Sequence, residues 1–225
     1  MGGGMGGAGG AVLLIGSSIL RLWPDPRGDL GGAWATDNQA FGGSTTAEVL
    51  AEMDARVLHR APRVVVYYCG SNDLMTGRGA GEAYANFARF AERLEGALPG
   101  VRLLYVSVIR SPAQALLGNL PALDELNEKV REFCAGRSGA DFVDVGGLFE
   151  TEDGHPRPQL FTEDFHHLRS AAYRKLGEVL RPRVAAAWEA ASQEPRDGGP
   201  RTLRFHTSTH HTNLEPSDRI EYRTS

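Results

Sequence analysis

Two serines and an Asp-x-x-His sequence carry groups suited to nucleophilic chemistry. Ser17 and Ser18 follow a short apolar run, where a hydroxyl could project into a crevice beside helix N–H groups that favour negative charge. Asp164 precedes His167 by three residues, so its carboxylate can reach Nδ1 of that ring and stabilise the imidazolium. His166 competes for this role without a carboxylate at the same spacing. Taken alone, these residues also fit an N-cap serine and a surface or packing histidine.

Gly42-Gly43 and Asn72-Asp73 could supply hydrogen-bond donors to the same reacting group. A glycine lets its backbone N–H approach a reacting atom closely, and an asparagine amide can face an oxyanion without a change of charge. Asp73 could anchor its loop by accepting hydrogen bonds from backbone N–H groups. In isolation, a tight turn explains the glycines equally well, and an Asn/Asp turn is the ordinary alternative for the second pair.

The elements that must position these groups alternate between strand-like and helix-like segments. A capping box at 45–48 starts one helix, and Ser170 caps a last helix that Pro182 should kink or split. Such alternation implies a parallel sheet with helices on both faces and a ligand site at the carboxyl ends of the strands. The predicted strands span 11–16, 33–38, 63–68, 101–109 and 142–145. The helix that starts at the capping box spans 45–60, and two further helices before the last one span 82–98 and 123–134.

Length and composition predict one globular domain with tails. The 225 residues are 41% hydrophobic, which is enough apolar material for a sizeable core, so the chain as a whole is not intrinsically disordered. The net charge of −4 gives no indication of a nucleic-acid footprint. No apolar run approaches a membrane span, and Cys69 and Cys134 are too few for a disulfide scaffold or a multi-cysteine zinc cluster. We expect a flexible leader at 1–10, a folded domain at 11–191 and a disordered tail at 192–225. The absence of a signal peptide favours the cytoplasm.

The order of these motifs resembles that of the SGNH hydrolases, which are also called GDSL-like lipases and esterases. Serine follows the first predicted strand, glycine the second and asparagine the third, and Asp-x-x-His stands near the end. The matching stretches are LLIGSSILRLWP (13–24), FGGSTTAEVL (41–50), VVYYCGSNDL (65–74) and EDFHHLRSAAY (163–173). The resemblance spans roughly 12–190. It implies an α/β fold, a three-layer α/β/α sandwich on a five-stranded parallel, flavodoxin-like sheet.

The resemblance also implies a serine esterase that uses neither a metal nor an organic cofactor. Ser18 matches the family's nucleophile, and Asp164 and His167 match the pair that activates it. The backbone N–H groups of Ser18 and Gly43 and the side-chain amide of Asn72 match the oxyanion hole. The implied partner is a small-molecule ester, and the oligomeric state stays open.

Two positions depart from the family pattern. Ser17 stands where the family commonly has aspartate, outside the triad, and it remains an alternative to Ser18 as nucleophile. Phe165 stands where relatives often have glycine, which would crowd the histidine loop and narrow the site.

The substrate and two rival functions complete the sequence-based hypothesis. Leu74, Met75 and Trp23 are expected to form apolar walls near the site, and the lack of a long apolar lid favours short acyl chains. One rival is a catalytically silent protein that binds a small ligand on the same fold. The other is a flavin or nucleotide binder, which would need a phosphate-cradling glycine loop that the sequence lacks.

Overall fold

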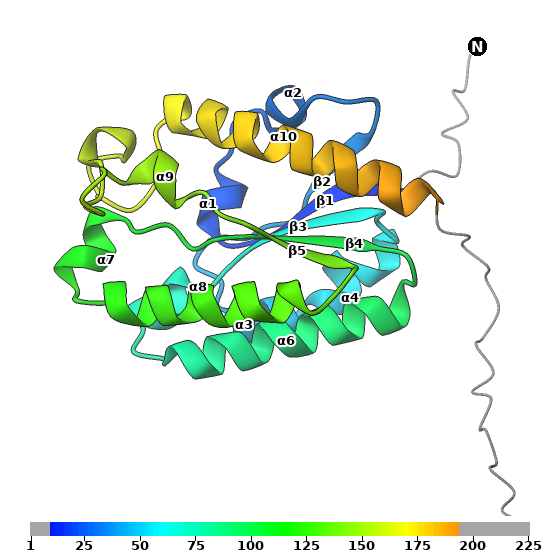
Figure 1. The fold of residues 1–225 in the computed structure, drawn as a ribbon, viewed down its shortest axis with the longest axis horizontal. Helices are drawn as coiled ribbons and strands as arrows, with labels where there is room; N and C mark the ends of the chain where they lie inside the picture. Colours follow the sequence, from blue (N-terminus) through cyan, green and yellow to red (C-terminus); the bar gives the residue numbers. More distant parts are fainter. Residues whose placement is uncertain (1–9, 194–225) are drawn as a thin grey trace, which may run out of the picture.

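A five-stranded parallel sheet forms the centre of the molecule (Figure 1). The computed structural model describes residues 10–193, so nearly all of the predicted leader and tail lies outside the described residues. The strands are β1 (Ala11–Gly16), β2 (Ala35–Asn38), β3 (Val64–Tyr68), β4 (Arg102–Val106) and β5 (Ala140–Val143), in the order β2-β1-β3-β4-β5. All neighbouring pairs are parallel. This is the flavodoxin-like strand order, and the predicted fold class is confirmed.

Helices cover both faces of the sheet and make three layers (Figure 1). One face carries α2 (Pro26–Leu30) and α10 (Ser170–Gln193); the other carries α3 (Thr46–Ala51), α4 (Met53–Arg56), α6 (Ala80–Ala97) and α8 (Leu120–Ala135). The remaining elements are α1 (Ser18–Arg21), α5 (Ser71–Met75), α7 (Pro112–Leu116), α9 (Gly146–Phe149) and the 3-10 turns η1 (Leu58–Arg60) and η2 (Pro158–Leu160). In the described part of the chain, no helix combines the length and apolarity that a membrane crossing needs.

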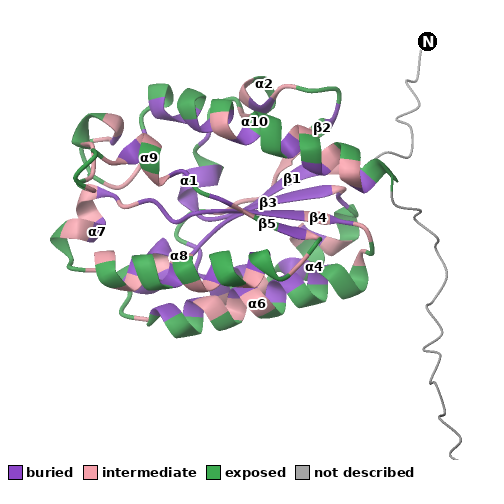
Figure 2. Cartoon of the chain, in the orientation of Figure 1, coloured by how far each residue is buried: buried purple, intermediate pink, exposed green. Residues whose placement is uncertain are grey.

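The two layers of core follow from the alternation of side chains along each strand. In β1, Val12 and Leu14 pack into the cluster beneath α10, and Leu13 and Ile15 pack into the cluster beneath α6 and α8. Both faces are therefore buried, as the burial colouring of the strands in Figure 2 shows. A strand buried on both faces needs an unbroken apolar sequence, which is why AVLLIG and VVVYY predict these strands so well.

The structure differs from the sequence expectation mainly in the helices. The capping box of Thr45 and Glu48 forms as predicted, but the segment that follows breaks at Glu52 into α3, α4 and η1 instead of one helix to Arg60. The last helix begins at Ser170 and is not split at Pro182, which lies inside α10 on its exposed face. Buried side chains on both sides of the proline hold the helix against the sheet. The short helices α2, α5, α7 and α9 have no strong sequence pattern.

Candidate active site

The first strand delivers its serines to the carboxyl edge of the sheet through a sharp turn. Gly16 has a φ of +138°, and a Cβ at this position would lie 1.8 Å from the carbonyl oxygen of Tyr68 in β3. Only glycine permits this close approach. The N–H of Ser17 then donates to the same carbonyl at 3.0 Å, and α1 begins at Ser18. The turn therefore fixes where the following hydroxyl points.

A chain of hydrogen bonds joins Ser18, His167 and Asp164. Nε2 of His167 lies 2.9 Å from Oγ of Ser18, and Nδ1 lies 2.5 Å from Oδ2 of Asp164. Ser17 does not take part, because its hydroxyl is fully buried and has no hydrogen-bond partner within the described residues. Of the two adjacent serines, the geometry therefore brings only Ser18 to the histidine.

The histidine loop is held rigid by Asp164 itself. Oδ1 of Asp164 accepts the backbone N–H groups of His166 and His167, each at 2.9 Å, and the hydroxyl of Thr162 at 2.7 Å. Burial alone would raise the pKa of Asp164, but these hydrogen bonds and the one from the His167 ring together hold that pKa well below its usual range. The carboxylate therefore stays ionised and can accept a hydrogen bond from Nδ1 of His167.

His166 occupies a different environment from its neighbour. Its ring packs edge-on against the ring of His167, with 5.0 Å between the centroids, and its Nδ1 lies 3.5 Å from Oγ of Ser111. Burial, followed by the charge of His167, lowers the pKa of His166, so this ring favours its neutral form. The structure thus places His166 beside the hydrogen-bonded chain and not in it.

Gly43 lies in the loop after β2, and Asn72 lies in the short helix α5 directly after β3, so each follows its strand as expected. Gly43 has a φ of +74°, in the region that favours glycine. Nδ2 of Asn72 donates to the carbonyl of Ser44 at 2.9 Å, which fixes the orientation of the amide and leaves its second N–H for another acceptor. Among the described residues, the backbone N–H groups of Ser18 and Gly43 donate no hydrogen bond. Three donors therefore remain for a ligand.

Ser44 is a buried junction that the sequence analysis missed. Its hydroxyl donates to the carbonyl of Gly16 at 3.0 Å, and its own carbonyl accepts from Asn72 and from Sγ of Cys69 at 3.3 Å. One residue thus ties together the loops that follow β1, β2 and β3. Its place directly after Gly43 was the available signal, although a serine in a turn is too common to predict such contacts.

Asp73 fixes the position of α5, the short helix after β3 that also contains Asn72. It is fully buried and accepts the backbone N–H of Thr46 at 2.9 Å and the hydroxyl of Thr46 at 2.6 Å. Burial raises the pKa of Asp73, and the hydrogen bonds from Thr46 oppose that rise. A second missed residue, Gln114, is also fully buried and donates from Nε2 to the carbonyl of Ser71 at 2.9 Å. Both contacts fix the short helix that carries Asn72.

The three expected wall residues have different surroundings. Trp23 is buried in the core beneath α10, where its ring stacks on Tyr173 and its Nε1 donates to Asp29 at 2.7 Å. Leu74 is buried in the opposite core cluster. Both side chains therefore pack into the core and leave little surface for a substrate, whereas Met75 is 39% exposed. Core packing against α10 and α6 accounts for this difference from the expectation.

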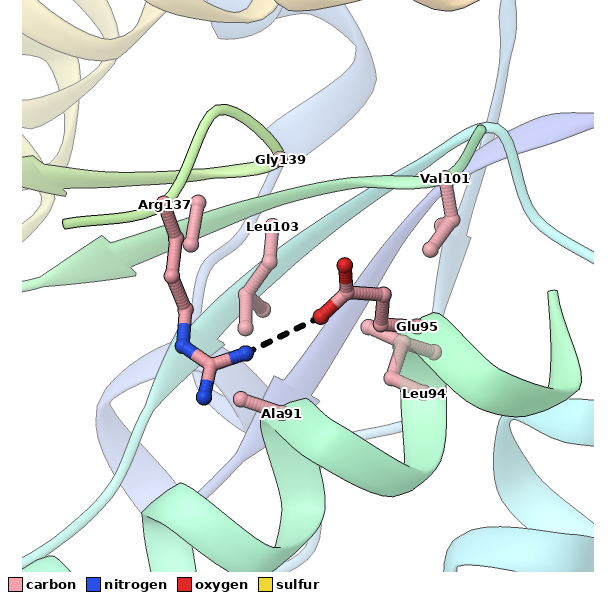
Figure 3. Close-up of a pocket in the computed structure, with 8 residues that line it drawn as sticks. Ala91, Leu94, Glu95, Val101, Leu103, Arg137 and Gly139 are labelled. Carbon is pink, nitrogen blue, oxygen red and sulfur yellow. Dashed lines mark hydrogen bonds and ion pairs between the residues drawn. The ribbon is translucent and has the colours of Figure 1, made fainter. Parts of the chain in front are cut away.

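Other hollows and clusters lie apart from this chemistry. Figure 3 shows an apolar pocket flanked by the ion pair of Arg137 and Glu95. It holds about 30 Å³ and lies at the amino ends of β4 and β5, opposite the edge that carries Ser18. The described residues contain no group of three or more His, Cys, Asp or Glu placed to hold a metal ion. The tail histidines 206, 210 and 211 lie outside the described residues.

Comparison with known proteins agrees with this fold and motif order. Residues 16–175 match the profile of the GDSL-like lipase/acylhydrolase family. A search of curated proteins returned no match. A GDSL-like lipase from Bacteroides thetaiotaomicron is similar in structure, with a TM-score of 0.69 and 17% identity over 79% of this chain and 88% of that one. A carbohydrate esterase of family 3 from Talaromyces cellulolyticus is also similar, with a TM-score of 0.63 and 12% identity over 80% of this chain and 98% of that one. An acetyl esterase variant with an acetate ion has a TM-score of 0.64 and 13% identity over 80% of this chain and 98% of that one.

Proposed function

This chain belongs to the GDSL-like lipase/acylhydrolase family, and on that premise we propose that it is a serine esterase that hydrolyses carboxylic esters with short acyl groups. Membership in this family supports ester hydrolysis in general. The observation that carries the finer proposal is the unbroken hydrogen-bonded chain from Ser18 through His167 to Asp164. A serine, a base and an orienting carboxylate in this geometry are the parts that acyl transfer requires.

In the proposed first step, His167 takes the proton of Ser18 as Oγ attacks the ester carbonyl. The 2.9 Å separation between Nε2 and Oγ is within proton-transfer reach. Asp164 holds Nδ1 protonated, so the lone pair of Nε2 faces the serine, and the carboxylate stabilises the imidazolium that forms. His167 then returns the proton to the leaving alcohol, and an acyl ester remains on Ser18.

In this proposal, three donors stabilise the tetrahedral oxyanion of that step. They are the backbone N–H groups of Ser18 and Gly43 and the second N–H of the Asn72 amide. All three are neutral and fixed before the reaction, so they need no reorganisation as charge develops. Water activated by His167 would hydrolyse the acyl ester by the reverse proton movements.

The proposal of short acyl groups rests on the absence of a long apolar lid in the sequence and on the core positions of Trp23 and Leu74. One structural relative is described as an acetyl esterase with an acetate ion. We therefore take acetate esters as the first substrates to test.

Labelling with a fluorophosphonate, followed by peptide mass spectrometry, tests the proposal. The expected result is one adduct on Ser18 that is absent from Ser18→Ala, retained in Ser17→Ala and strongly slowed in His167→Ala. An adduct on Ser17 would move the nucleophile by one position. Folded protein that neither reacts nor hydrolyses p-nitrophenyl acetate would overturn the proposal in favour of a catalytically silent protein that binds a small ligand.

A further inference from the structure

An open apolar hollow lies between α7 and the segment that precedes the histidine loop. It measures about 370 Å³, and every residue that lines it is apolar: Pro112, Ala115 and Leu116 of α7, together with Pro156, Pro158 and Phe165. Leu116 is 81% exposed, so no other described part of the chain covers it. An exposed surface that is wholly apolar and concave is typical of a binding site for an apolar group.

Phe165 links this hollow to the proposed catalytic histidine. It lies within the turn that runs from Asp164 to His167, and its φ of +57° is unusual for a bulky residue. The turn is over-determined, because the N–H of Phe165 donates to Thr162 and its carbonyl accepts from Ala113. Strained residues of this kind persist mainly at functional sites.

The exposure of Phe165 strengthens this link. Phe165 is 46% exposed, so its own burial offsets little of the backbone strain. Glycine would adopt the same conformation without strain. The backbone conformation therefore gives no reason for an aromatic residue here, and its side chain instead adds apolar surface to the hollow.

Contacts fix α7 against the histidine loop, so the hollow keeps a constant position relative to His167. The N–H of Ala113 donates to the carbonyl of Phe165 at 3.0 Å, and the hydroxyl of Ser111 lies 3.5 Å from Nδ1 of His166. Ser111 caps α7 through the N–H of Gln114. Figure 1 places α7 and the segment after α9 at the carboxyl end of the sheet, where the strands deliver the site.

The chemistry of the proposed reaction decides which part of an ester lies on this side. His167 must donate its proton to the oxygen of the leaving alcohol, so that oxygen lies within hydrogen-bond reach of Nε2. The alcohol portion therefore extends from the serine on the side of the histidine loop.

From this placement we infer that the hollow binds the alcohol portion of the substrate, and that this enzyme selects esters of longer apolar alcohols over ethyl esters. The inference rests on the proposed esterase function. Leu116 and Phe165 form the two exposed faces that contact the alcohol. The acyl group can stay short, since it does not use this surface.

Two ester series separate the alcohol portion from the acyl portion. The first keeps the acetyl group and varies the alcohol from ethyl through butyl to hexyl; the second keeps ethanol and varies the acid from acetate to hexanoate. Complete burial of a methylene raises affinity about fourfold. An open hollow should supply about half of that free energy, which is roughly a twofold rise in affinity for each methylene. We expect kcat/KM to rise about 16-fold from ethyl to hexyl acetate at roughly twofold for each of four methylenes.

Leu116→Ser and Leu117→Ser form a matched pair of variants. Leu117 is also exposed, at 56%, and follows Leu116 directly, but it does not line the hollow. Leu116→Ser should flatten the alcohol series, so that its kcat/KM falls further below that of the wild type as the alcohol lengthens, and Leu117→Ser should keep the rise of the wild type. Both residues are exposed, so neither change should affect folding.

Each alternative outcome is distinct. A rise along the acid series that Leu116→Ser abolishes would assign the hollow to the acyl chain and overturn the inference. Flat alcohol series with intact hydrolysis of ethyl acetate would also overturn it and leave the esterase function standing. If light scattering shows a wild-type dimer that Leu116→Ser dissociates without altering either series, the hollow is a surface between copies of this chain. If the wild-type protein hydrolyses no ester of either series, the proposed function itself is refuted.

Discussion

Ser44→Ala tests whether one buried hydroxyl positions the proposed oxyanion hole. The substitution removes the hydrogen bond from Oγ to the carbonyl of Gly16 and leaves the backbone of Ser44, including its bond from Asn72, in place. The Gly16 carbonyl keeps a partner, because the N–H of Phe41 donates to it at 2.9 Å. No buried acceptor is orphaned, so the loss of stability should stay near 1 kcal/mol.

The effect on catalysis should exceed what that small loss of stability implies. The lost bond joins the loop that carries Gly43 to the end of β1, two residues before Ser18, and two of the proposed oxyanion donors belong to Gly43 and Ser18. Removing one such donor outright costs about 10²–10³ in kcat. Ser44→Ala loosens a donor without removing it, and we expect a fall of about tenfold in kcat with little change in KM.

The assay is steady-state hydrolysis of p-nitrophenyl acetate together with thermal unfolding. Ser107→Ala is the control, because Ser107 is also a buried serine and lies outside the proposed machinery. Its hydroxyl accepts the N–H of Val145 at 2.9 Å, so this variant leaves a buried donor unpaired and should lose at least as much stability as Ser44→Ala, about 1–3 kcal/mol. A loss of 1 kcal/mol should lower Tm by about 2–4 °C for a domain of this size. Both variants should lose stability, and only Ser44→Ala should lose kcat.

A double-mutant cycle with Asn72→Ala sharpens the test. If Ser44 acts through the oxyanion hole, its effect on kcat should shrink once Asn72 is absent, because the two residues serve one unit. Full kcat in a destabilised Ser44→Ala enzyme, or strict additivity in the cycle, would refute the reasoning.

Four further outcomes follow from the same geometry. Asn72→Ala should lower kcat about 10²–10³-fold with an unchanged fold, as circular dichroism and steady-state rates would check. Hydrogen bonds hold the pKa of Asp164 low, so the stability that this carboxylate adds to the fold is complete above about pH 4 and is lost only as the pH falls toward its folded-state pKa. The profile of kcat/KM against pH should accordingly show one ionisation on its acid side, and a second ionisation near pH 4 would contradict the low pKa of Asp164. The added Cβ of Gly43→Ala would meet no atom within 4 Å, so thermal unfolding should show only the cost of the positive φ, about 1 kcal/mol. The fall in kcat should be larger than this small loss of stability explains. Gly16→Ala should lose more than about 3 kcal/mol in denaturant unfolding, because its Cβ would meet a backbone carbonyl.

The sequence predicted the sheet because its central strands, β1, β3 and β4, are buried on both faces. Such strands are uninterrupted apolar runs, and AVLLIG and VVVYY are unambiguous. The order of the serine, glycine, asparagine and histidine motifs also predicted a site at the carboxyl edge, since parallel strands all end there. The family membership confirms the resemblance on which that site was built.

Contacts between loops could not be predicted in the same way. The role of Ser44 depends on two backbone carbonyls from distant segments, which leave no side-chain pattern in the sequence. Trp23 and Leu74 were expected at the site because of their proximity along the chain, but tertiary packing turns both into the core. The exposed hollow beside α7 depends on a loop conformation at Phe165 that its residue type disfavours.

The distance along the chain between the paired groups has a consequence for biosynthesis. Ser18 and His167 are 149 positions apart, and the histidine loop immediately precedes α10, whose buried face completes one layer of the core. A nascent chain therefore carries its proposed nucleophile early but gains the proposed base only when the final helix leaves the ribosome and docks. Contacts between such distant segments form late, because loop-closure entropy opposes them until both partners are ordered. Reactivity toward a phosphonate thus reports completed folding, and incomplete chains carry an inert serine.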